Sequence, residues 1–432
     1  MTDIAEQNLQ ICKRRWPTLA AQISAAAPPQ EVAWEGSEES PTLSVNGLRL
    51  WSAYDAEAEA RLQATMIPED SKQAWVYGVG SGDLARELLK RDAIRQLNLV
   101  PLNLGLFHLL MHVLDYRDWL SDSRTQLWDP GSQLTVNTPF SAIPPCLQLC
   151  DPPLAALRDH LTNELIRPFE EERQARRAPM RRQHIEANMD FIASDGDVAE
   201  LFGTAPGSTA FVCAAGPTLL KTAPWIIEHR DEGLLIAVDG ALKPLLRVGL
   251  IPDYVLSLDD NSETIARYFD GDLSACTNST LIYTPIVDHA PLSNWPGRKL
   301  TMYTHEPIYD DLKQSHPKAE LFVAGSVIHP AVDLAVRLRS AKVLLFGADF
   351  GFPDGVVHAN DEAPIDFYAN AAKAEIVALN GHGQSIPTLA SFNGYRIGLE
   401  DFISHHQDVK FINMCRAGAF IHGAEYEESG GV

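Results

Sequence analysis

The chain has 432 residues, of which 45% are hydrophobic, and its formal net charge at pH 7 is −22. This length predicts two or three domains, each large enough to bury a core of its own. The acidic balance argues against bulk binding to nucleic acid or to an anionic membrane, because both attract basic surfaces. Insertion into a membrane is not expected either, since no run of about 18 apolar residues occurs.

The cysteines predict neither disulfides nor a metal site. There are six of them, they are scattered, and Cys213 lies inside an apolar run. Such a density in a chain of this length is not that of a disulfide framework. Cys146 and Cys150 are four positions apart, but no second Cys or His pair completes a zinc site. The N-terminal residues lack the basic-then-apolar pattern of a secretion signal, so we expect a cytoplasmic protein with reduced thiols.

Several elements are expected in the first third of the chain. Residues 1–35 predict a helix followed by a break that contains proline. A hairpin is predicted for residues 41–56, where Asn46-Gly47 is a dipeptide typical of two-residue turns. A strand, a glycine-rich loop, a helix and a second strand then succeed one another at 74–77, 78–82, 83–91 and 97–101. This succession predicts a first parallel α/β unit.

Three glycines give the loop of that unit a pattern found in dinucleotide and S-adenosylmethionine sites: Gly78, Gly80 and Gly82. A cofactor loop of this kind needs an acidic residue at the tip of the next strand to hold a ribose. The next strand ends Val100-Pro101 and carries no acidic residue at its tip. We therefore favour a structural turn, with a ligand-binding loop as the alternative.

The segment at 152–191 has a helical pattern, and we interpret it as a connector between two α/β domains. It contains a cluster of basic residues, namely Arg173, Arg176, Arg177, Arg181 and Arg182. A solvated helix face is one role for these arginines. A docking surface for an acidic partner is the other.

Strand-like apolar runs recur through the second half, at 210–214, 234–238, 254–258, 279–283, 299–303, 320–323, 342–346 and 411–414. Helices are predicted at 326–338 and 364–379. The predicted fold class is therefore α/β, with two Rossmann-like parallel-sheet domains joined by the helical connector. We expect the first domain at 1–150, the connector at 151–194 and the second domain at 195–432.

The loop after the run at 210–214 is the first candidate binding site. Ala215 and Gly216 let a backbone approach a ligand closely, Pro217 suits a first helical turn, and Thr218 offers a hydroxyl. Free N–H groups and the helix dipole would favour an anion such as a phosphate there. An ordinary tight turn between strand and helix is the alternative.

Carboxylates end two further strands. Asp239 and Asp259 follow the runs at 234–238 and 254–258. The carboxyl ends of parallel strands form the ligand crevice of an open sheet, so both side chains are candidates for ligand contacts. Capping of the next helix is the other role that such residues fill.

Two more loops carry candidate residues. Gly325 and Ser326 open a predicted helix, where Ser326 is an N-cap or a phosphate contact. Asp349 follows the run at 342–346, and His358 comes soon after it. A histidine near several strand ends is a candidate acid or base, because its pKa is close to neutral. An exposed loop histidine without a chemical role is the alternative.

The second half also contains an ordered set of motifs: FVCAAGPTL, GLIPDYVLSLD, AGSVIHPAVDLA and LLFGADFGFPDGVVHA. Together with the opening segment NLQICKRRWPTLA, they resemble those of the motility-associated factor (Maf) proteins, the bacterial flagellin glycosyltransferases. The family's GxGPSL motif has Ala214 here in place of its first glycine and Thr218 in place of its serine. Both residues keep the size or the hydroxyl of the family residue, while the slightly narrower loop bears on donor preference and activity.

The resemblance implies a sialyltransferase-like second domain. Such proteins move a nonulosonic acid, of the pseudaminic or legionaminic type, from its CMP-activated form to Ser or Thr of flagellin. The resemblance places the loop at 215–219 and Ser326 with Gly325 beside the donor, and Asp239 and Asp259 along the nucleotide cleft. It places Asp349 and His358 nearest the transfer. Our first candidate for the base that accepts the hydroxyl proton is His358, and the second is Asp259.

Two other functions stay open. The same domain family includes an archaeal-type pterin diphosphokinase, an ATP-dependent phosphotransferase that would hold Mg²⁺ on Asp239, Asp259 and Asp349. The last alternative is a flagellin-binding protein without activity, whose pocket has degenerated at Ala214. Mg²⁺ is the one cofactor considered, and whether it assists the glycosyltransferase as well stays open.

Overall fold

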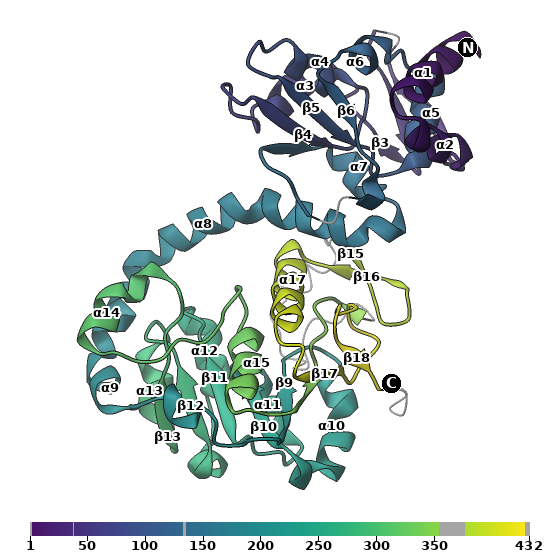
Figure 1. Ribbon diagram of the computed structural model, residues 1–432. Helices are drawn as coiled ribbons and strands as arrows, with labels where there is room; N and C mark the ends of the chain where they lie inside the picture. Colours follow the sequence, from purple (N-terminus) through teal and green to yellow (C-terminus); the bar gives the residue numbers. More distant parts are fainter. Residues whose placement is uncertain (1, 38, 133–134, 354–375, 428–432) are drawn as a thin grey trace. The chain divides into compact units, whose positions relative to one another are not determined.

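The computed structural model describes residues 2–37, 39–132, 135–353 and 376–427. The chain forms two compact units, Met1–Leu165 and Ile166–Val432, and each contains a parallel sheet with helices (Figure 1). The predicted α/β class is therefore confirmed. The three-part division at residues 150 and 194 stays a prediction. None of the helices within the described ranges is both long enough and apolar enough to cross a membrane.

The first unit contains two sheets in its described residues. Strands β1 to β3 are antiparallel, and β6, β5, β4 and β7 form a parallel sheet in that order. The strands are β1 Val32–Gly36, β2 Pro41–Val45, β3 Leu48–Arg49, β4 Gln73–Tyr77, β5 Gln96–Val100, β6 Thr125–Leu127 and β7 Phe140–Ala142. The helices are α1 Thr2–Arg15, α2 Pro17–Ala25, α3 Ala56–Ala64, α4 Asp83–Leu89, α5 Leu104–Val113, α6 Arg117–Ser121 and α7 Pro144–Gln148.

The predicted hairpin turn is present between β2 and β3. Asn46 and Gly47 both have positive φ angles, of 51° and 77°. Two successive residues of this kind match the right-handed twist of the strands that they join. The predicted hairpin of residues 41–56 is thus confirmed in its strands and its turn, and β1 adds a third strand to it.

The glycine loop between β4 and α4 is filled by the protein's own side chains. A Cβ atom on Gly78 would lie 2.5 Å from the Cβ of Cys146. On Gly82, it would lie 2.8 Å from the indole nitrogen of Trp119. Both distances are too short for non-bonded heavy atoms, so glycine is required by packing. This favours the structural turn over a ligand loop.

The second unit is built on a larger sheet. Its nine strands in the described residues are all parallel, in the order β18-β17-β14-β9-β10-β11-β12-β13-β8. They are β8 Gly196–Asp197, β9 Thr209–Cys213, β10 Leu234–Val238, β11 Tyr254–Ser257, β12 Thr280–Tyr283, β13 Arg298–Thr301, β14 Lys342–Phe346, β17 Lys410–Asn413 and β18 Glu425–Tyr426. A separate antiparallel pair consists of β15 Ile376–Leu379 and β16 Ser385–Thr388.

Helices cover this sheet, as in other parallel sheets, because both faces of such a sheet are apolar. The helix α15 packs against β9, β10 and β14, and α11 packs against β10 and β11. The helices are α8 Ala155–Ala187, whose first residues belong to the first unit, α9 Met189–Ser194, α10 Leu219–Glu228, α11 Asp239–Arg247, α12 Ser262–Phe269, α13 His289–Asn294, α14 Asp310–Ser315, α15 Ile328–Arg337 and α17 Ala390–Ser404.

The strand order reverses between β9 and β14. From β9 the chain proceeds through β10, β11, β12 and β13 in one direction, and then crosses to the other side of β9 to form β14. In open α/β sheets, ligands bind at the carboxyl ends of the strands where the order reverses. The loops that follow β9 and β14 are therefore the expected edges of a site.

Two predicted elements of the second unit differ from the structure. The run at 320–323 is not a strand: Glu320 makes a single bridge with Tyr303, because β8 already pairs with β13 at this edge of the sheet. The N–H of Phe322 donates to Asp333 instead of to a neighbouring strand. The helix predicted at 364–379 is wrong at its end, where Ile376–Leu379 is the strand β15, and its residues up to 375 lie outside the described ranges.

Candidate functional site

A large cavity lies at the carboxyl ends of the strands of the second unit. Its volume is about 1110 Å³, which is enough for a nucleotide with a further group attached. The loops after β9, β10, β11 and β14 contribute residues 214–216, 238–240, 258–260 and 347–351. Further walls come from 304–309, from 323 and 325–328, from α8 and from Phe392 and Tyr395 on α17. Candidate residues from four strand ends are thus brought together.

The loops after β9 and β14 touch each other at the reversal of strand order. The N–H of Gly216 donates to the carbonyl of Gly347 over 2.9 Å. A Cβ atom on Gly216 would overlap that carbonyl and the carboxylate of Asp349. This close approach requires glycine at position 216, whether or not a ligand is bound.

Asp349 joins the same two loops through Thr218. Its carboxylate accepts hydrogen bonds from the N–H of Thr218 over 2.9 Å and from the hydroxyl of Thr218 over 2.6 Å. Burial raises the pKa of Asp349 to about 6, although the bonds from Thr218 and the charge of Lys221 lower it. The start of α10 therefore already faces an anion of the protein itself.

The predicted loop residues divide into two groups in the structure. Ala215 and Gly216 line the cavity, together with Asp349. Pro217 and Thr218 do not, since Thr218 is fully buried against Asp349. A role for this loop in holding a phosphate stays a prediction, and it would rest on Ala215 and Gly216.

Asp239 is a buried carboxylate that lines the cavity at the start of α11. Its oxygens accept hydrogen bonds from the N–H of Gly240 and from the hydroxyl of Ser257, both over 2.8 Å. Burial raises the pKa of Asp239 to about 7; the charge of Asp259 raises it as well, while the two hydrogen bonds lower it. The group therefore changes its charge near neutral pH.

This pKa predicts that Asp239→Asn stabilises the protein at pH 8. The folded pKa of about 7 lies above the value of about 3.9 of an unfolded chain, so the stabilising contribution of Asp239 is full below pH 4 and is lost as the pH rises through 7. At 1.36 kcal/mol per pKa unit, the gain is at most about 4 kcal/mol at pH 8. Calorimetric melting at several pH values measures it.

The control is Asp401→Asn, which changes an exposed aspartate of α17. The gain in melting temperature of Asp239→Asn should shrink as the pH falls to 5, and Asp401→Asn should show no such trend. A gain for Asp239→Asn that is equal at pH 5 and pH 8 would contradict the interpretation.

The turn before α15 is held by a buried histidine. His329 Nδ1 lies 3.2 Å from the N–H groups of Ala324 and Ser326, and Nε2 lies 2.9 Å from the carbonyl of Tyr395. Burial lowers the pKa of His329 to about 4, so the ring is neutral at pH 7. With its proton on Nε2, the ring donates to Tyr395 and accepts from the two N–H groups at Nδ1, which also lies 2.9 Å from the carbonyl of Ser326. It connects the turn to α17.

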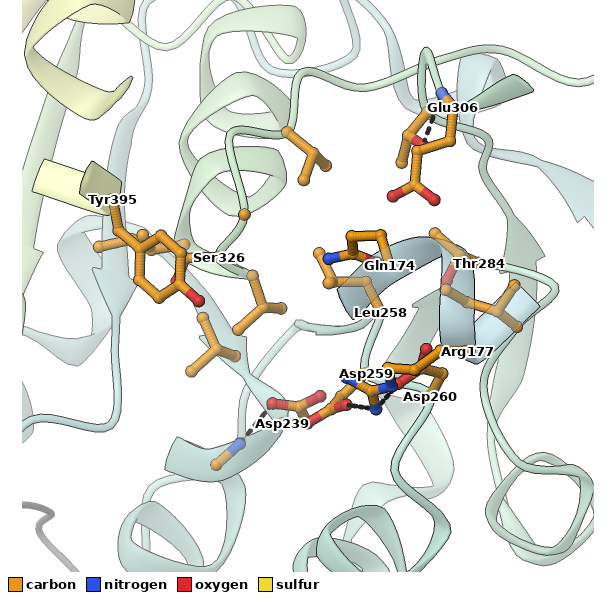
Figure 2. A pocket seen from close by; sticks show the side chains of 18 of the residues that line it. Gln174, Arg177, Asp239, Leu258, Asp259, Asp260, Thr284, Glu306, Ser326 and Tyr395 are labelled. Carbon is orange, nitrogen blue, oxygen red and sulfur yellow. Dashed lines mark hydrogen bonds and ion pairs between the residues drawn. The ribbon is translucent and has the colours of Figure 1, made fainter. Parts of the chain in front are cut away.

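Gly325 is required next to this histidine. Its φ angle is +90°, and a Cβ atom would lie 2.6 Å from the ring of Tyr395. Gly325 and Ser326 both line the cavity, as does Tyr395. Figure 2 shows Ser326 and Tyr395 on one side of the cavity and Arg177 with Asp259 and Asp260 on the other.

The arginines of α8 are the residues of the site that the sequence did not assign to it. Four of the five line the cavity: Arg173, Arg177, Arg181 and Arg182. The fifth, Arg176, is exposed and pairs with Glu172 over 2.6 Å. The signal was present in the spacing, because residues 173, 177 and 181 are four apart and share one helix face. The interpretation as a solvated face is therefore wrong for Arg181, which is buried, whereas Arg173 and Arg182 are exposed as it predicts.

The structure describes one of the two candidate bases. Asp259 lines the cavity; its side chain is 42% exposed, and it accepts a hydrogen bond from the N–H of Asn261 over 3.0 Å. His358 lies outside the described residues. The assignment of either as a base stays a prediction.

Metal binding has no assembled ligand set in the residues that the structure describes. Within the described ranges, no group of three or more His, Cys, Asp or Glu side chains is placed to hold an ion. Asp239 and Asp349, two of the three carboxylates considered for Mg²⁺, each accept two hydrogen bonds from protein donors. They do not form a common site with Asp259.

Comparisons with known proteins find similarity to a family model and to solved structures. Residues 183–355, from the end of α8 past β14, match a family described as 6-hydroxymethylpterin diphosphokinase MptE-like. Among solved structures, the chain is similar to the MAf glycosyltransferase from Magnetospirillum magneticum AMB-1, with 16% identity and a TM-score of 0.46. That match covers 100% of this chain and 75% of the other. No curated protein matches the chain.

Proposed function

We propose that the chain is a cytoplasmic glycosyltransferase that moves a nonulosonic acid from its CMP-activated form to Ser or Thr of flagellin. The observation that carries the proposal is the cavity of about 1110 Å³ at the reversal of strand order, with an arginine-bearing helix as one wall. A donor of this class carries a phosphodiester and a carboxylate, and arginine binds both groups well. The ordered motifs that resemble the Maf family support the same class of reaction.

In this proposal the candidate residues divide between binding and transfer. Ala215, Gly216 and Asp239 face the nucleotide from the strand ends, and Gly325 with Ser326 faces it from the start of α15. Pro217 and Thr218 act from behind the cavity, where Thr218 holds Asp349 in place. Asp349, His358 and Asp259 stand nearest the reacting atoms.

The transfer proceeds with inversion. The acceptor oxygen forms a bond to the anomeric carbon while the bond from that carbon to the phosphate oxygen breaks, and CMP leaves with the electron pair. The transition state resembles an oxocarbenium ion, as in other glycosyl transfers. A base takes the proton of the hydroxyl, and we assign this role to His358 first and to Asp259 second.

Replacing His358 with alanine is expected to lower the transfer rate by roughly 10²–10⁴-fold, the range typical for loss of a general base. Binding of CMP should change little, because the base contacts the acceptor. Single-turnover transfer with a CMP-activated sugar and flagellin measures the rate. Full activity of His358→Ala would exclude His358 as the base. The transfer rate of Asp259→Asn would then show whether Asp259 is the base.

A phosphotransferase is the second candidate, since residues 183–355 match a pterin diphosphokinase family. That reaction would need Mg²⁺ with ATP, and the described carboxylates do not offer an assembled ligand set. Binding of flagellin without any nucleotide would instead favour the non-catalytic alternative.

A thermal-shift screen separates these functions. The probes are CMP, CMP-sialic acid, magnesium-ATP and S-adenosylmethionine. A ligand at 100 times its Kd stabilises a protein by about 2.7 kcal/mol, which is readily measured. The proposal predicts a shift with the CMP compounds only, followed by transfer to flagellin. A shift with magnesium-ATP alone would favour the phosphotransferase.

A further inference from the structure

Positive charge in the cavity comes from one helix. Every Arg and Lys among the described residues that line the cavity belongs to α8, and they are Arg173, Arg177, Arg181 and Arg182. The chain as a whole carries a net charge of −22, which repels an anionic ligand. Local cations are therefore needed to bind such a ligand, and α8 supplies them.

Backbone donors at the two helix starts near the cavity are largely engaged within the protein. The N–H of Gly216 donates to Gly347, and the N–H of Thr218 donates to Asp349. At α15, the N–H of Ser326 faces the ring nitrogen of His329. These N–H groups are the ones that would otherwise hold a phosphate at a helix start. Donors for an anion must therefore come mainly from side chains, among which the arginines of α8 carry the positive charge.

Two arginines of α8 are held in place by acidic side chains of the second unit. Asp260 is 2% exposed, and its carboxylate pairs with both Arg177 and Arg181. Arg181 also donates to Glu306 over 2.8 Å, and Arg177 lies 3.7 Å from Asp259. Since residues 177 and 181 are one helical turn apart, Asp260 fixes both guanidinium groups at the same wall.

These pairs leave part of each guanidinium group without a partner. Arg177 uses Nη2 toward the aspartates, and Arg181 uses Nε and Nη1. Within the described ranges, Nε and Nη1 of Arg177 and Nη2 of Arg181 have no hydrogen-bond partner. A guanidinium group has five N–H donors, so each of these arginines can still bind an oxyanion.

We propose that Arg177 and Arg181 bind an acidic group of the ligand, with Asp260 as the residue that positions them. The proposal rests on the proposed function for the identity of the ligand, which supplies either a phosphate or a carboxylate. A guanidinium group already held in position loses less freedom when it binds such a group, so the wall is preorganised. Asp260 acts through the arginines and does not contact the ligand.

The test uses Arg177→Gln and Arg181→Gln in the full chain, with Arg176→Gln as the matched control. Arg176 is on the same helix but is exposed, does not line the cavity, and pairs only with Glu172 among the described residues. Titration calorimetry measures binding of CMP, cytidine, inorganic pyrophosphate and free N-acetylneuraminic acid. Cytidine lacks an acidic group, while the last two probes separate phosphate from carboxylate.

Loss of one charged hydrogen-bonding group is expected to weaken binding of the probes whose acidic group the arginines contact by roughly 10- to 100-fold. Binding of cytidine should change by less than about twofold, because uncharged contacts are unaffected. Weakening confined to pyrophosphate and CMP assigns the arginines to phosphate, and weakening confined to N-acetylneuraminic acid assigns them to the carboxylate. Arg176→Gln should bind every probe as the wild type does.

Folding of the variants is checked separately. Arg181→Lys keeps a charge opposite Asp260, and it should melt close to the wild type while still losing affinity for CMP, since lysine lacks the planar fork of arginine. A wild type that binds pyrophosphate through these arginines and fails to bind CMP would contradict the proposed CMP-activated donor, while the assignment of the arginines to an acidic group would stand. Folded variants that bind all anions as tightly as the wild type would overturn it, as would a wild type that binds none.

Discussion

Replacing Gly216 with alanine is expected to remove nucleotide binding and to lower the melting temperature of the second unit by roughly 5–10 °C. The added Cβ atom would overlap the carbonyl of Gly347 and the carboxylate of Asp349. The loops after β9 and β14 must then separate, at a cost of about 2–3 kcal/mol for overpacking. Differential scanning calorimetry and titration with CMP measure the two effects.

The matched control for this change is Gly131→Ala in the first unit. Among the described residues, a Cβ atom there would meet only Asp129, at 3.4 Å, and Gly131 is exposed. Gly131→Ala should therefore melt within about 0.5 kcal/mol of the wild type. Unchanged binding and melting in Gly216→Ala would show that the two loops can separate without loss, and that the close approach is not required.

Among Arg177, Arg181 and the acidic residues that pair with them, Asp260 should be the residue whose replacement with alanine destabilises the protein most. The replacement would leave Arg177 and Arg181 without their shared carboxylate, and removal of one partner from a buried ion pair costs about 3–5 kcal/mol. Calorimetric unfolding is the measurement. Because the arginines also lose their positions, affinity for CMP should fall together with stability.

Asp259→Asn is the control for stability. Asp259 is half exposed and lies 3.7 Å from Arg177, so its ion pair should contribute less than about 1 kcal/mol. The comparison separates a buried pair from an exposed one on neighbouring residues of the same loop. Equal losses of unfolding free energy in the two variants would mean that the ion pairs of Asp260 stabilise the protein no more than the ion pair of Asp259 does.

Much of the sheet could be predicted from the sequence because its strands are short apolar runs that end on small or acidic residues. The runs at 210–214 and 234–238 coincide with β9 and β10 to within one residue. The strand predicted at 320–323 is wrong, because apolar composition does not reveal that β8 already occupies the edge beside β13. The strand β15 was missed because its four residues, IVAL, are all apolar and fit a helix as well as a strand, and β16 was missed because its four residues include Pro387.

The candidate site was predictable where it follows the strands and not where it comes from elsewhere. Ala215, Asp239 and Asp349 follow β9, β10 and β14, and the rule that ligands bind at such ends placed them together. The arginines of α8 precede every strand of the sheet and follow none of them. Their helical spacing indicates a shared face, but only the folded chain shows that this face meets a cavity.

The glycine loop between β4 and α4 bears on how such motifs are interpreted in other chains. Substitution at Gly78 or Gly82 is blocked by Cys146 and Trp119, so selection can retain these glycines in the absence of any cofactor. The same glycine motif can therefore reflect either close packing against the protein's own side chains or the binding of a cofactor. The residues to compare between relatives are the bulky ones opposite the glycines: where they become small, the loop is open to a cofactor.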